Sequence, residues 1–124
     1  MTMPGRPFVW YELMTSDAVA AQKFYQAVFG WQMRDSGMPG MQYTLISSEG
    51  ADLGGLFSFV SHDCGEDARP CWLGYIGSPD VDEDARRVTA AGGRVLKAPT
   101  DIPGVGRFAV VADPHGAVFQ LLRR

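Results

Sequence analysis

The sequence predicts an α+β fold built from two copies of one strand–helix–strand–strand–strand module. Three observations support this prediction. The chain aligns with itself, so that Asp17 falls on Asp80 and Gly50 falls on Gly116, and a long period that occurs only twice indicates a duplicated module. The chain contains 15 glycines and 8 prolines, and such frequent turns favour many short strands over a helix bundle. Each copy also opens with a short strand that leads into a capped helix.

The first strand of each module is expected at about residues 8–14 and 71–77, where β-forming side chains gather. A helix follows each strand, because the next residues are of the types that cap helix N-termini by accepting backbone hydrogen bonds. The candidates for these caps are Ser16 and Asp17 in the first module, and Ser78 and Asp80 in the second.

Apolar residues at helical spacing predict which side of each helix packs on its sheet. Gly30 and the Gly92–Gly93 pair are expected to end the two helices, because glycine accepts the left-handed conformation found there. The predicted packing faces are Ala21, Phe24, Tyr25 and Val28 in the first helix, and Val81, Ala85, Val88 and Ala91 in the second.

A second strand, a Pro-Gly loop and a hairpin complete each module. The hairpin turn of the second module is the better defined, because Asp113, Pro114 and Gly116 occupy the first, second and fourth places of a type I turn. We therefore expect a single domain of residues 1–124. Its first module covers residues 1–60, a polar linker covers 61–70, and its second module covers 71–124.

Composition excludes several classes of partner. The net charge is −3 and lysine occurs only at Lys23 and Lys97, so neither nucleic acid nor an anionic membrane is an expected partner. No apolar run approaches the roughly 20 residues that a membrane-spanning helix needs. The first residues lack the charged-then-apolar pattern of a secretory signal, so we expect a cytoplasmic protein.

Two stretches carry a resemblance to a known family: WYELMTSD with FYQAVFGW near the start, and GRFAVVADPHGAVFQLL near the end. Together with the repeated module, they make the chain similar to the vicinal oxygen chelate superfamily, which includes glyoxalase I, bleomycin resistance proteins and extradiol dioxygenases. Within it, the chain most resembles the glyoxalase-like, hydroxylase-type group. The resemblance implies curved, cup-shaped mixed sheets with their helices outside. It does not imply one reaction, because this scaffold hosts unrelated chemistries.

The resemblance also assigns positions to a metal site. Metal-dependent members place one ligand on the first strand and one on the last strand of each module, and these positions correspond here to Trp10, Gly54, Leu73 and Gln120. Only Gln120 carries a ligating atom, and an amide oxygen is a weak ligand for a transition metal. We therefore expect neither a metal nor another cofactor.

The same resemblance predicts which side chains line the cup. Successive side chains of a strand point to opposite faces, so Trp10, Glu12 and Met14 share one face, which the family turns inward. An apolar lining with few polar groups is typical of a small-molecule site. The residues expected to contact a ligand are Trp10, Glu12, Met14, Leu73, Tyr75, Arg107, Gln120 and Leu122.

Glu12 has three possible roles on this face. A carboxylate in apolar surroundings is costly unless it is paired, so Glu12 could bind a cation such as Arg107 and stabilise the sheet. It could instead recognise a ligand, or transfer protons as a catalytic general acid or base. Trp10 likewise either fills the core or offers a stacking surface to an aromatic ligand.

Other polar side chains are weaker candidates. His115 lies in the expected hairpin turn and is interpreted as a solvent-exposed turn residue. His62 and Cys64 lie in the linker and lack the spacing of a metal or nucleophile site. Cys64 and Cys71 are expected to be free thiols.

The function expected first is the binding of a small aromatic or amphipathic metabolite or drug without a metal, as in bleomycin resistance proteins. One alternative is a metal-independent lyase, isomerase or hydroxylase-type enzyme that uses Glu12 for proton transfer. A second alternative is a metal-dependent, glyoxalase- or dioxygenase-like enzyme with a non-standard site. A pure interaction module is least favoured, because no exposed apolar stretch indicates an interface. The resemblance further implies a homodimer.

Overall fold

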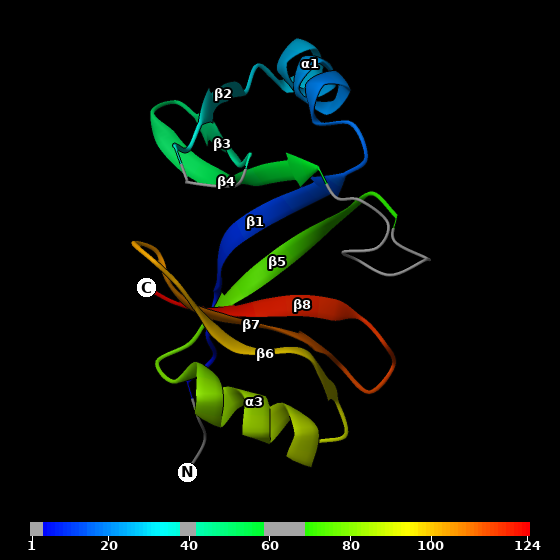
Figure 1. Cartoon of the computed structure of the whole chain (residues 1–124), viewed down its shortest axis with the longest axis vertical. Helices are drawn as coiled ribbons and strands as arrows, with labels where there is room; N and C mark the ends of the chain where they lie inside the picture. The colour runs from blue at the N-terminus through cyan, green and yellow to red at the C-terminus, as the bar shows by residue number, and fades with distance from the viewer. Residues whose placement is uncertain (1–3, 38–41, 59–68) are drawn as a thin grey trace. The chain divides into compact units, whose positions relative to one another are not determined.

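The structure, a computed structural model, describes residues 4–37, 42–58 and 69–124 (Figure 1). The order strand–helix–strand–strand–strand occurs twice, which confirms the predicted α+β class. Neither of the helices in these ranges is long and apolar enough to cross a membrane. In chain order the elements are β1 (Phe8–Thr15), α1 (Ala18–Phe29), β2 (Gln32–Asp35), β3 (Thr44–Ser48), β4 (Ala51–Ser58), β5 (Cys71–Gly77), α3 (Val81–Ala90), β6 (Arg94–Ile102), β7 (Gly106–Ala112) and β8 (Val118–Arg123).

The chain forms two compact units. The first unit is Trp10–Trp72, and the second unit combines the N-terminal residues up to Val9 with Leu73–Arg124. The strand β1 therefore gives its first two residues to the second unit and the rest to the first. Each unit is described by itself below.

In the first unit the strands lie in the order β2-β3-β4-β1. The strand β3 runs antiparallel to β2 and β4, whereas β1 runs parallel to β4, so the sheet is mixed. The helix α1 packs on one face of this sheet, over buried aliphatic side chains. The buried side chains are Leu13, Ile46 and Leu56, and α1 packs on them through Ala18, Ala21 and Tyr25.

Only half of the apolar face predicted for α1 packs on the sheet. Ala21 and Tyr25 contact the core as expected, but Phe24 and Val28 are 56% and 55% exposed. Ala18, Ala21 and Tyr25 follow one another at intervals of three and four residues and so form one stripe. Phe24 and Val28 form the neighbouring stripe, which the sheet does not reach.

In the second unit the strands lie in the order β5-β8-β7-β6, with β5 parallel to β8 and the other pairs antiparallel. The helix α3 covers one face of this sheet through Val81 and Val88, as the sequence predicts. Ala85 is also buried, whereas Ala91 caps the helix end and is exposed. The sheet residues under α3 are Ile76, Ala109, Val111, Phe119 and Leu121.

Both helices begin at the aspartate of the predicted pair of caps. The Asp17 carboxylate accepts the backbone N–H of Ala20 at 3.0 Å, and the Asp80 carboxylate accepts that of Glu83 at 3.1 Å. Gly30 ends α1 with a φ of 71°, the left-handed conformation that glycine accepts without strain.

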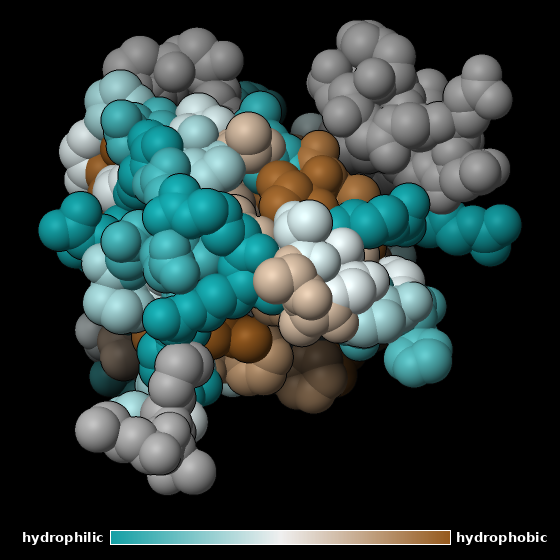
Figure 2. All heavy atoms as spheres, turned by 90° about the horizontal axis from the view of Figure 1, so that it is seen from below, coloured by the Kyte–Doolittle hydropathy of each residue, from teal (hydrophilic) through white to brown (hydrophobic). Residues whose placement is uncertain are grey.

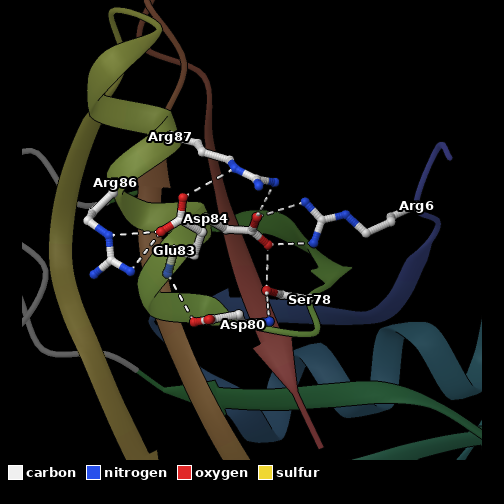
Figure 3. A network of polar contacts seen from close by, with 7 residues as sticks. All are labelled: Arg6, Ser78, Asp80, Glu83, Asp84, Arg86 and Arg87. Carbon is white, nitrogen blue, oxygen red and sulfur yellow. Dashed lines mark hydrogen bonds and ion pairs between the residues drawn. The ribbon is translucent and has the colours of Figure 1, made fainter. Parts of the chain in front are cut away.

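Polar contacts join the N-terminal residues to the rest of the second unit. The backbone N–H of Gly77 donates to the Pro7 carbonyl at 3.1 Å. The Arg6 guanidinium forms two hydrogen bonds with the Asp84 carboxylate of α3, one of them at 2.9 Å, and the Ser78 hydroxyl donates to the same carboxylate (Figure 3).

Seen from the α3 side, the surface is mostly hydrophilic, with small apolar areas between the polar ones (Figure 2).

Candidate functional site

Three side chains of the first unit form a continuous hydrogen-bonded chain. The Trp10 indole N–H donates to the Tyr43 hydroxyl oxygen at 3.0 Å, and the Tyr43 hydroxyl donates to Oε1 of Glu12 at 3.1 Å. The direction of this chain follows from its members, because an indole N–H only donates and a carboxylate only accepts. Glu12, which is 5% exposed, is thus the buried acceptor in which this series of hydrogen bonds ends.

Strand alternation places the two outer members of this chain. In β1 the side chain of Leu13 packs into the core under α1, so its neighbours Glu12 and Met14 point to the opposite face, and Trp10 lies on that face too. The prediction that Trp10, Glu12 and Met14 share a face therefore agrees with the register of β1 against β4.

Gly55 makes room for the middle member. It lies directly opposite Glu12 in the β1–β4 pair, and a Cβ atom there would stand 1.8 Å from the Tyr43 hydroxyl oxygen. The Tyr43 ring can reach Glu12 across β4 only because residue 55 has no side chain. Phe57, two residues further on in β4, places its ring 6.3 Å from the Tyr43 ring and so gives that ring an aromatic neighbour.

The electrostatics keep the Tyr43 proton in place. Burial raises the pKa of Tyr43 far above its ordinary value, and the negative charge of Glu12 raises it further. Tyr43 is therefore a neutral hydrogen-bond donor throughout the physiological range. The Cys71 thiol, also in the first unit, has its pKa raised by burial and then by the charge of Glu12, so it is a poor nucleophile at neutral pH.

The second unit gathers four of the predicted residues on one face of its sheet. Tyr75 lies opposite Gln120 in the β5–β8 pair, and Phe108 lies opposite Leu122 in the β7–β8 pair. This is the face away from α3, because the alternating residues Ile76 and Leu121 pack under the helix. The four predicted residues are Leu73, which is half-buried, and Tyr75, Gln120 and Leu122, which are buried.

Arg107, another of the residues expected to contact a ligand, lies on the opposite face of that sheet from Gln120 and Leu122. It stands in register with Arg123 and alternates with Phe108, on the side where α3 packs. Its guanidinium donates two hydrogen bonds to Asp82, at 2.8 and 2.9 Å, and one to Asp101 at 3.1 Å. The cation considered for Glu12 thus has two acidic partners, and Glu12 accepts from Tyr43.

Tyr43 and Gly55 were not among the predicted site residues. The signal for them was weak but present. Tyr43 and Leu45 alternate into β3, and the pair Gly54–Gly55 interrupts the apolar pattern of β4, which in a strand often marks a close approach of another group. The weaker candidates His62 and Cys64 lie outside the described residues, and His115 is exposed in its turn as expected.

With this geometry established, comparison with known proteins identifies the family. Residues 8–121 match the Glyoxalase/Bleomycin resistance protein/Dioxygenase superfamily. The chain belongs to this superfamily. The vicinal oxygen chelate resemblance noted in the sequence is thereby confirmed.

Two curated relatives within the superfamily are similar over nearly the whole chain. The chain is 38% identical over 122 residues to CFP32 of Mycobacterium tuberculosis, a protein named as a glyoxylase, and this match covers 93% of the chain and 43% of the relative. It is 34% identical over 132 residues to the anthracycline biosynthesis protein DnrV of Streptomyces peucetius, covering 98% of the chain and 48% of the relative. The chain thus spans about half the length of these relatives.

Solved structures support the superfamily fold at lower identity. The methylmalonyl-CoA epimerase of Mycobacterium tuberculosis superimposes with a TM-score of 0.67 at 16% identity, covering 94% of this chain and 86% of that one. The hypothetical protein BH1468 from Bacillus halodurans superimposes with a TM-score of 0.72 at 10% identity, covering 98% and 96%. At these identities the likeness concerns the fold alone.

The residues present do not fit the metal site found in many superfamily members. Of the four positions that the resemblance assigns to ligands, Trp10, Gly54 and Leu73 have no ligating side-chain atom, and Gln120 offers only an amide. Gly54 could not be replaced easily by a ligand, because a Cβ there would stand 1.9 Å from the Tyr11 carbonyl oxygen. Across residues 4–37, 42–58 and 69–124, no three His, Cys, Asp or Glu residues gather as a metal site requires.

Proposed function

We propose that this superfamily member binds a small aromatic or amphipathic molecule through the Trp10–Tyr43–Glu12 chain, without a metal ion. The observation that carries the proposal is a buried carboxylate whose Oε1 is held by a phenol that is itself held by an indole. A carboxylate oriented in this way can accept a hydrogen bond from a hydroxyl or amine of a ligand. The half-buried Trp10 ring beside it offers an apolar surface.

The names of two relatives suggest a first class of probe. The proteins DnrV and DauV are named for anthracycline biosynthesis, so a planar, hydroxylated polycyclic compound is a rational starting ligand. Such a compound combines a stacking surface for Trp10 with hydroxyl donors for Glu12, and both groups lie on one face of β1.

The experiment is calorimetric titration of wild type, Glu12→Gln and Glu49→Gln with a panel of hydroxylated aromatic compounds. Glu49 is an exposed carboxylate of the same unit, so its replacement matches the change of charge. We expect Glu12→Gln to weaken binding about tenfold, the effect of losing one charge-assisted hydrogen bond, and Glu49→Gln to leave it unchanged. Equal affinity of all three proteins, or no binding across the panel, would reject the proposal.

A second candidate function is metal-independent proton transfer by Glu12. It is favoured by the fixed donor at Oε1, which holds the carboxylate in one orientation, as a general base requires. In such a step Glu12 would accept a proton from the substrate and return it, with no net change in oxidation state. Once a ligand is known, Glu12→Gln separates the two functions: loss of turnover at unchanged affinity supports catalysis, and weaker affinity alone supports binding.

We further propose that two copies of the chain form a homodimer through the exposed stripe of α1, Phe24 and Val28. The curated relatives are about twice as long as this chain, so a second copy would supply a comparable length. Beside the stripe, Tyr25 stacks on Trp31 with ring centroids 5.4 Å apart and accepts a hydrogen bond from Trp72 at 3.1 Å, which gives a rigid aromatic surface.

Light scattering after size exclusion tests this dimer. The double variant Phe24→Gln, Val28→Gln should have the mass of a monomer. The matched variant Val19→Gln, also exposed on α1 but on another side of the helix, should keep the mass of a dimer. A monomeric wild type, or equal masses for both variants, would contradict the proposal.

A further inference from the structure

The second unit contains a groove that the proposed function does not use. It has a volume of about 490 Å³ and is formed by the turn between β6 and β7, the start of β7, and the end of β8. This volume lies within the range typical of small-molecule sites. Its lining includes Asp101 and the three arginines Arg107, Arg123 and Arg124.

The charges around this groove are unusual for this chain. The whole chain has a net charge of −3, yet three guanidinium groups and one carboxylate line the groove. Arg107 and Arg123 lie directly opposite each other in the β7–β8 pair, an arrangement in which like charges repel. The groove therefore carries more positive than negative side chains, even when Asp82, which binds Arg107, is counted with it.

The two opposed arginines differ in their partners. Arg107 is held by Asp82 and Asp101 through three hydrogen bonds. The side chain of Arg123 forms no hydrogen bond or ion pair with any residue of the described ranges. Arg123 thus keeps its donors for another molecule, whereas the charge of Arg107 is balanced by its two carboxylate partners.

Gly106 explains why the groove can form at the end of β8. Its φ is 151°, and a Cβ atom on it would stand 2.0 Å from the carbonyl oxygen of Arg123. Only glycine lets the turn approach the backbone of β8 so closely. The turn itself is closed by a hydrogen bond from the Val105 N–H to the Ile102 carbonyl at 3.0 Å.

We propose that this groove binds a phosphate group, either as inorganic phosphate or as the terminal phosphate of a small ligand. The planar fork of an arginine matches the oxygens of phosphate, and Arg123 has that fork available. Arg124 adds positive charge beside it, whereas Asp101 and Asp82 are already engaged by Arg107. The proposal is independent of the proposed function, because every residue in it belongs to the second unit.

The test is an NMR titration of the whole chain with inorganic phosphate, and separately with phenyl phosphate, at constant ionic strength. The amide signals of Gly104, Val105 and Gly106 report on the groove. The variant Arg123→Gln removes the available guanidinium. Arg94→Gln is its matched control, because Arg94 is an exposed arginine of the β6–β7 hairpin, at the end opposite to the turn that forms the groove. The variant Arg123→Lys keeps the positive charge but removes the planar pair of guanidinium donors. It also provides the test if Arg123→Gln does not fold.

We expect saturable shifts confined to the groove, about tenfold weaker binding in Arg123→Gln, an intermediate affinity in Arg123→Lys, and no change in Arg94→Gln. Tighter binding of phenyl phosphate would indicate the terminal group of a larger ligand, and equal binding of the two probes would indicate phosphate itself. Shifts that do not saturate, or equal weakening in Arg123→Gln and Arg94→Gln, would overturn the proposal.

Discussion

Tyr43 and Glu12 are 31 positions apart in the chain, and they are joined by a 3.1 Å hydrogen bond that orients a buried carboxylate. The contact depends on a third position, Gly55, which lies under the Tyr43 ring. The candidate site of the first unit is thus assembled from β1, the residue before β3, and the middle of β4. Each of these contributions can be tested separately.

Replacement of Tyr43 by phenylalanine should destabilise the protein. It removes the hydroxyl that accepts from Trp10 and donates to the Glu12 carboxylate, and loss of a buried hydrogen bond to a charged group costs about 1–3 kcal/mol. Urea unfolding monitored by circular dichroism measures this difference. Val19→Ala, at an exposed side chain of α1 in the same unit, should change the free energy of unfolding by less than about 0.5 kcal/mol. Similar losses in the two variants would contradict the role given to Tyr43.

Replacement of Gly55 by alanine should displace the Tyr43 ring. The added Cβ would overlap the hydroxyl, and such overpacking costs about 1–3 kcal/mol. The cost should depend on the ring. In a Tyr43→Ala background the same substitution should therefore be nearly neutral, which a double-mutant cycle of unfolding free energies measures. Additive effects of the two substitutions would show that Gly55 is required for another reason.

The Asp84 carboxylate should make the stability of the protein depend on pH. Burial alone would raise the pKa of Asp84, but the hydrogen bonds from Arg6 and Ser78 outweigh it and hold the pKa below its ordinary value (Figure 3). A lowered folded-state pKa contributes stability above the unfolded pKa of about 3.9, and this is lost as pH falls through the folded pKa.

Unfolding measured between about pH 5 and pH 2 should therefore show a steep loss of stability in wild type and a shallower one in Asp84→Asn. At pH 7, Asp84→Asn should be less stable by about 1–3 kcal/mol, because Arg6 loses its charged partner. The exposed control Glu49→Gln should keep the wild-type slope. A slope in Asp84→Asn as steep as that of wild type would show that other carboxylates cause the acid sensitivity.

The two aspartate caps should contribute similarly to the two helices. Asp80→Ala removes the acceptor for the Glu83 N–H and Asp17→Ala removes that for the Ala20 N–H, and each loss should cost about 0.5–2 kcal/mol. The variants Asp80→Asn and Asp17→Asn keep an acceptor and should lose much less. Thermal unfolding compares all four proteins, and asparagine variants as unstable as the alanine variants would assign the effect to charge.

The local sequence determined much of what the structure contains. Aspartate before each helix and glycine after the first set where the helices begin and end, because backbone groups at helix ends need local partners. The repeat of one module and the motifs near both ends were enough to recognise the superfamily. Strand alternation placed Trp10, Glu12 and Met14 on one face, since this follows from the geometry of an extended chain alone.

Tertiary structure decided the rest, because it concerns partners that are distant in sequence. Nothing near Glu12 indicates Tyr43 as its donor, and nothing near Arg107 indicates that Asp82 and Asp101 hold it on the face under α3. The outward turn of Phe24 and Val28 likewise depends on how far the sheet beneath α1 extends. Local patterns determine the direction of a side chain relative to its own backbone, whereas the packing of separate segments determines which residues that side chain contacts.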